Sequence, residues 1–216
     1  MNKVSGLSKY KFEKISIESQ KNSLRLLSDA ILLYENESFP SSFQLSVLSL
    51  EEFSKAKWVE HYYFTALTND GFPAIDIEQD WLKLLFNHPK KQMNFVSREL
   101  FEYSPKFFQM IQSKELEVKK QRAVYVGLSR HKGKIDTGSR ISIPTKAITQ
   151  ADAKKLISLM VSEFKNIEEK IEEQDIFWDI PEMDLIIKEP LFSSLKTWNH
   201  KSGIKGKRWY PAWKNG

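Results

Sequence analysis

Apolar residues recur at intervals of three and four along most of the chain, which is the spacing of one face of an α-helix. This spacing predicts helices over about 17–36, 41–68, 75–86, 88–107 and 149–174. A weaker pattern predicts a short helix at 182–188. The chain is therefore expected to be an all-α protein, and the lengths of these helices favour an antiparallel bundle.

Capping and breaking residues set the expected boundaries of these helices. Ser41 or Ser42 can cap the second helix, and Thr149 with Asp152 three residues later has the sequence of a capping box. A further helix is expected to start at His88, because the following proline is favoured in a first turn. Pro105 is expected to kink or split that helix.

The helical spacing is lost between about 119 and 146, where an irregular basic loop or small hairpin is predicted. This segment has eight basic residues and one acidic residue, and residues 190–216 have six basic residues and none that is acidic. The rest of the chain is mildly acidic, although the whole carries a net charge of +5. The pattern indicates a helical domain at 1–175 and a C-terminal extension at 176–216 with a basic, Trp-rich tail.

Both basic segments mix Lys and Arg with aromatic residues, a combination that suits a polyanion with exposed bases. RNA, rather than DNA, is the expected partner. The candidate RNA-binding residues are Lys120, Arg122, Tyr125, Arg130 and Lys132. Two other readings stay open: the basic loops complement acidic helices of this chain or of a partner, or the tail binds a membrane surface.

The composition of the chain excludes several classes of chemical site. The chain has no cysteine, which excludes disulfides, thiolate-bound zinc and cysteine nucleophiles. It also lacks nucleotide-binding glycine motifs and the paired histidines of common zinc sites, so no cofactor and no metal centre are predicted. With neither a signal-like apolar segment nor a run long enough to span a membrane, a cytoplasmic protein is expected.

Charged residues interrupt the apolar stripe of the second helix in the run Leu50-Glu51-Glu52-Phe53-Ser54-Lys55-Ala56. The helical period places Glu52 and Lys55 toward the bundle interior, where charges need partners. The plainer alternative is a Glu–Lys pair on the helix surface. His88 is the leading candidate for proton transfer, since a helix start with Lys91 nearby is a ready anion site.

Three segments together resemble the AbiV-type abortive-infection proteins of the HEPN superfamily. They are Leu50 to Ala56, Asn87-His88-Pro89-Lys90-Lys91, and Lys120-Gln121-Arg122-Ala123-Val124-Tyr125-Val126. The resemblance covers roughly 20–175. It implies a dimerising all-α bundle that acts in bacterial phage defence, where infection triggers growth arrest. Many HEPN relatives are metal-independent ribonucleases that place an Arg four to six residues before a His, and no arginine of this chain has a histidine at that interval.

If catalysis follows from this resemblance, His88 is the general acid or base, Lys91 and Lys55 stabilise phosphate charge, and Glu52 orients one of them. The leading hypothesis is an abortive-infection effector that arrests growth or translation by cleaving or binding RNA. The alternative is a non-catalytic helical protein that engages a phage protein or the ribosome. A homodimer and a phage protein as trigger are the other expected partners.

Overall fold

The computed structural model describes residues 6–68, 71–72, 74–97, 103–128, 130–131, 134–172 and 190–204. The helix predicted at 182–188 lies outside these residues. Helices dominate, and their order is α1 (Lys9–Glu35), α2 (Phe39–Thr68), α3 (Ile75–Leu84), α4 (His88–Ser97), α5 (Pro105–Gln112), α6 (Glu115–Arg122), α7 (Pro144–Ala147), α8 (Gln150–Glu172) and α10 (Pro190–Leu195). The predicted all-α fold is confirmed.

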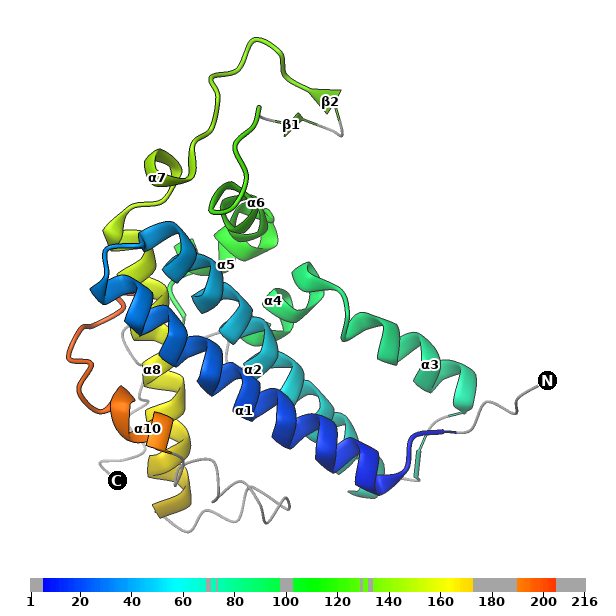
Figure 1. Cartoon of the computed structure of the whole chain (residues 1–216). Coiled ribbons are helices and arrows are strands. Elements are labelled where there is room, and N and C mark those ends of the chain that lie inside the picture. Colours follow the sequence, from blue (N-terminus) through cyan, green and yellow to red (C-terminus); the bar gives the residue numbers. More distant parts are fainter. Residues whose placement is uncertain are drawn as a thin grey trace, which may run out of the picture.

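The long helices α1 and α2 run antiparallel side by side, and α8 crosses them on one side (Figure 1). The predicted hairpin is also present, because β1 (Arg130–His131) pairs antiparallel with β2 (Lys134–Ile135). It lies at the end of an extended segment between α6 and α7 that projects away from the helices (Figure 1). Among the described residues, no helix is long and apolar enough to cross a membrane.

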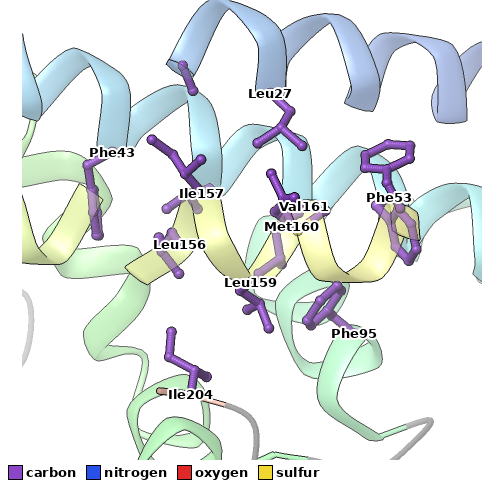
Figure 2. Packing of buried hydrophobic residues seen from close by; sticks show 14 of the residues in the cluster. Leu27, Phe43, Phe53, Phe95, Leu156, Ile157, Leu159, Met160, Val161 and Ile204 are labelled. Atoms are coloured by element: carbon purple, nitrogen blue, oxygen red, sulfur yellow. The ribbon is translucent and has the colours of Figure 1, made fainter. Parts of the chain in front are cut away.

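The main hydrophobic core forms where α1, α2, α4 and α8 meet. Leu27 of α1, Phe53 of α2 and Phe95 of α4 surround the apolar face of α8 (Figure 2). Four residues of the C-terminal part belong to the same core: Phe192, Leu195, Trp198 and Ile204. The indole Nε1 of Trp198 donates to Ser158 Oγ on α8 at 2.9 Å, so the chain from α10 to Ile204 packs onto the bundle.

Serines, rather than large apolar residues, fill much of the contact between α1 and α2. Ser23 and Ser49 are fully buried, and each hydroxyl donates to the other residue's carbonyl oxygen at 2.8 Å. Small side chains let the two helices approach closely while these hydroxyls stay paired. Ser42 also belongs to this contact, because its hydroxyl donates to the carbonyl of Ala30.

The expected cap of α2 is therefore wrong. The helix begins earlier, at Phe39, and Ser42 lies inside it with its side chain bonded to α1. Other boundary predictions are confirmed. Thr149 and Asp152 exchange reciprocal capping bonds before α8, and Pro105 starts α5 after the cap of Ser104.

The close contact of α1 and α2 predicts that Ser49→Leu lowers the free energy of unfolding by about 1–3 kcal/mol, since extra methylene groups would overpack the seam. Ser41→Leu, on an exposed position of the same helix, should change it by about 0.5 kcal/mol or less. Urea unfolding followed by circular dichroism measures both. Equal stability of the two variants would contradict this description of the seam.

Candidate functional site

Glu51 is the centre of a buried polar cluster between α2, α4 and α6. Its side chain is only 1% exposed, yet three donors reach its two oxygens. His88 Nδ1 lies 2.5 Å from Oε2, while Gln92 Nε2 and Lys120 Nζ donate to Oε1 at 2.7 and 2.8 Å. A buried carboxylate is tolerated where such partners compensate its lost hydration, and these three contacts supply that compensation.

The packing of α4 against α2 determines where His88 and Lys91 lie. Ser54 Oγ donates to the carbonyl oxygen of Lys91 at 2.7 Å, and Asn94 Nδ2 donates to Ser54 Oγ at 2.9 Å. These bonds hold α4 against α2, about one turn after the start of α4. His88 is the first residue of α4, and its side chain is 48% exposed although Nδ1 contacts the buried Glu51.

The contact with Glu51 defines the roles of the two imidazole nitrogens. A carboxylate oxygen accepts hydrogen bonds, so we assign Nδ1 as the N–H group that donates a hydrogen bond to Glu51. In the neutral ring this leaves Nε2 as the nitrogen with a lone pair. Because the ring is half-exposed, His88 combines a fixed orientation with access to a ligand.

Glu52 and Lys55 form an ion pair within α2, as the alternative interpretation of the sequence predicted. Lys55 Nζ donates to both carboxylate oxygens at 2.8 and 2.9 Å, and Asn22 Nδ2 of α1 reaches the same carboxylate at 3.2 Å. The predicted position of the pair in the bundle interior is wrong. Glu52 and Lys55 keep 16% and 21% of their side chains exposed, while Glu51 occupies the buried position.

Lys91 is a buried cation whose two carboxylate contacts are both long. Its side chain is 7% exposed, and the nearest carboxylate oxygens belong to Glu52 at 3.8 Å and Glu51 at 4.0 Å. Burial lowers the pKa of Lys91 and outweighs the two carboxylates, which raise it; Lys55 and Lys120 lower it further. The ammonium group is thus buried near both carboxylates, one turn after His88 on α4.

Lys120 also belongs to this cluster. It was expected to bind RNA, but its side chain is 7% exposed and contacts Glu117 at 2.7 Å in addition to Glu51. Burial opposes ionisation of Glu117, but the bonds and charge of Lys120, with donors from Gln121 and Gln92, outweigh it and hold the pKa of Glu117 below its usual value. Lys120 therefore stabilises the buried carboxylates.

The lowered pKa of Glu117 predicts a loss of stability in acid. A carboxyl group whose folded pKa is depressed stabilises the protein above its unfolded pKa and loses this contribution as the pH falls through the folded pKa. The free energy of unfolding of Glu117→Gln should therefore fall less between pH 6 and pH 3 than that of the wild type. Urea midpoints at the two pH values measure this difference, and an equal fall in both proteins would contradict it.

The other candidate RNA-binding residues lie beyond the cluster. Arg122 ends α6 and is exposed, and Tyr125 is 69% exposed in the segment that leads to the hairpin. Arg130 is in β1, and Lys132 lies outside the described residues. The structure therefore brings His88, Glu52, Lys55, Lys91 and Lys120 together, while Arg122 and Tyr125 lie along the chain that extends from α6.

Three residues of the cluster were not predicted from the sequence as site residues: Glu51, Gln92 and Glu117. Glu51 had a usable signal, because Val47, Leu50 and Ser54 surround it on the buried stripe of α2 at helical spacing. Gln92 and Glu117 had none, since their role depends on how α4 and α6 meet. Among the described residues, no group of three or more His, Asp or Glu is placed to hold a metal ion.

These observations define the class of the molecule as an all-α protein with a buried carboxylate that holds a half-exposed histidine among lysines. The chain belongs to the AbiV family of the HEPN superfamily, since the HEPN_AbiV family model, described as AbiV, matches residues 12–162. The family expected from the three motifs is thus confirmed, and all three lie within the matched range. Comparisons with curated proteins and with solved structures gave no match.

Proposed function

We propose that the protein is an abortive-infection effector that cleaves RNA without a metal ion at the Glu51-centred cluster. The observation that carries this proposal is the contact between His88 Nδ1 and buried Glu51, which orients a half-exposed imidazole. A carboxylate that holds a histidine in one tautomer prepares it for proton transfer. Membership of a family of abortive-infection proteins supports the biological role.

The proposed reaction uses the nucleophile that RNA itself contains. His88 Nε2 takes the proton of a 2′-hydroxyl, the resulting oxygen attacks the adjacent phosphorus, and the bond from phosphorus to the 5′-oxygen breaks. The leaving oxygen takes up a proton from water or from the histidinium ion. The products are a 2′,3′-cyclic phosphate and a 5′-hydroxyl end.

Lys91 and Lys55 supply positive charge where the phosphate becomes more negative. Lys91 lies one turn after His88 on α4, and Lys55 is held near it through Glu52. Fixed charges of this kind stabilise a transition state because they need no rearrangement during the reaction. Glu52 orients Lys55, whose ammonium group donates to both of its oxygens.

The proposal also includes the RNA-binding residues, the compartment, the partners and the C-terminal extension that the sequence predicts. Arg122, Tyr125, Arg130 and Lys132 would bind the RNA backbone and bases along the segment after α6. The protein would act in the cytoplasm as a homodimer, on free RNA or RNA of the ribosome, and a phage protein would trigger it. The C-terminal part from 176, with its basic tail, would act as an extension of the helical domain.

The experiment is to incubate wild-type and His88→Ala protein with total bacterial RNA in EDTA and to sequence the fragment ends. The wild type should give discrete cuts with cyclic phosphate and 5′-hydroxyl ends, and the variant should give none. A 2′-O-methyl RNA should resist both proteins, because it has no free 2′-hydroxyl. Equal cutting by both proteins would show that His88 is not part of the catalytic site.

The same experiment decides between cleavage and the non-catalytic alternative. The absence of the Arg and His spacing common among HEPN ribonucleases favours this alternative. If neither protein cuts and both retain RNA or ribosomes, the basic segments bind without catalysis.

A further inference from the structure

A cavity of about 400 Å³ lies between the second half of α2 and α3. Trp58, Tyr62 and the exposed His61 and Thr65 line it from α2, and Trp81 lines it from α3. Its volume is within the range of roughly 300–1,000 Å³ that is usual for sites of small ligands. The walls are mainly aromatic, with two polar side chains among them.

The cavity lies on the same face of α2 as the Glu51-centred cluster. From Glu51, steps of four, three, four and three residues lead to Lys55, Trp58, Tyr62 and Thr65, which is the spacing of one helix face. At about 1.5 Å of rise per residue, Trp58 lies roughly 4.5 Å along the helix from Lys55. The charged cluster and the aromatic cavity are therefore neighbours along one face of α2.

Ring contacts hold the aromatic residues of the cavity wall in place. The rings of Tyr62 and Trp81 stack with their centroids 3.9 Å apart, and Phe12 of α1 packs 5.6 Å from Tyr62 and 6.2 Å from Trp81. The hydroxyl of Tyr62 is shielded from solvent and has no hydrogen-bond partner among the described residues. The cavity thus has a fixed aromatic surface.

We propose that this cavity is a base-stacking subsite for single-stranded RNA. A base of the strand stacks in the cavity while a phosphate of the same strand lies at Lys55, Lys91 and His88. The proposal rests on the proposed function, because it assumes that RNA binds at the cluster. Aromatic side chains beside a positively charged path are the usual means of binding single strands, since every base has a flat aromatic face.

The neighbouring charges favour an RNA base over an uncharged aromatic ligand. Lys91 is no closer than 3.8 Å to a carboxylate of the described residues, and Lys55, which is 21% exposed, lies only one turn from Trp58. A phosphate would satisfy Lys91, and the base attached to the same strand would reach the aromatic rings. His61 and Thr65 can pair with the polar edge of that base.

The test measures binding of a fluorescent single-stranded RNA octamer by anisotropy, in the His88→Ala protein so that the RNA stays intact. Adding Trp58→Leu should weaken binding about tenfold, in line with the loss of one stacked base. Trp58→Phe should restore most of it. Phe64→Leu removes an exposed aromatic residue from another face of the same helix and should leave binding unchanged.

Two further probes separate stacking from other effects. An octamer of the same backbone without bases should bind Trp58→Leu and its parent equally, since it has nothing to stack. Thr65→Glu, at an exposed rim position, should weaken binding of the normal octamer even if Trp58→Leu does not fold. Adenosine monophosphate should bind far more weakly than the octamer.

Several results would overturn the subsite. They are unchanged binding with Trp58→Leu, an equal loss with the octamer lacking bases, or adenosine monophosphate binding as tightly as the octamer. If one of these results is found but the wild-type protein still shows His88-dependent cleavage, the proposed function stands and only the subsite is wrong. If none of the proteins binds RNA, both the proposed function and the base-stacking subsite are wrong.

Discussion

Glu51→Ala is expected to lower the free energy of unfolding by about 3–5 kcal/mol, since it removes the acceptor of a buried, hydrogen-bonded charge cluster. Lys120 and Gln92 would lose one acceptor each, and His88 would lose its bond through Nδ1. For a chain of this length the loss corresponds to a melting temperature lower by about 6–20 °C. Thermal unfolding followed by circular dichroism measures the change.

Glu52→Ala is the matched control for this prediction. Its carboxylate is adjacent in the sequence but more exposed, so its removal should cost about 1 kcal/mol or less. Glu51→Gln keeps the shape and one acceptor oxygen, and its stability should lie between those of the wild type and Glu51→Ala. A melting temperature of Glu51→Ala within about 2 °C of the wild type would show that the cluster is not a source of stability.

Lys91→Met is expected to lower the rate of RNA cleavage at saturating RNA by about 10²–10³-fold, the effect of removing one fixed charge from a transition state. The stability should change little. Methionine keeps the buried aliphatic stem, and the lost ammonium group lies 3.8 Å or more from its carboxylates. Single-turnover cleavage of a defined RNA measures the rate, and urea unfolding measures the stability.

Lys90→Met supplies the matched control, because Lys90 is the exposed neighbour of Lys91 on the same helix. It should cleave at close to the wild-type rate. Lys91→Arg should recover part of the activity, since the charge is kept while its geometry changes. Equal losses in Lys90→Met and Lys91→Met would indicate a general effect of charge and would contradict a specific role of Lys91.

The sequence was sufficient for the helices that have an apolar stripe. It predicted the last residues of α1 closely but placed its start near 17 instead of Lys9, because Phe12 and Ser16 are the buried residues of α1 before 17 and only Phe12 is apolar. Apolar periodicity does not register serines, whose burial here depends on bonds to the backbone and serines of α2. The same serine contact explains why Ser42 is not a cap.

The site could be predicted only in part for a similar reason. Of the motif residues, Glu52, Lys55 and Lys91 lie together, and His88 joins them through Glu51. Whether Glu51 or Glu52 is buried depends on the rotation of α2 against α4, which a mixed stripe of apolar and charged residues leaves open. The burial of Lys120 depends on α6 packing over Glu51, and a count of basic residues cannot distinguish a buried lysine from an exposed one.

The most direct test of the central claim, that the Glu51-centred cluster carries the defence activity through His88, is the plating efficiency of a panel of phages on bacteria that express wild-type or His88→Ala protein at equal levels. The half-exposed ring of His88 makes this variant the least disruptive change in the cluster. The wild type should reduce plating of at least one phage, and His88→Ala should abolish this reduction. Full protection by His88→Ala at wild-type abundance would contradict it.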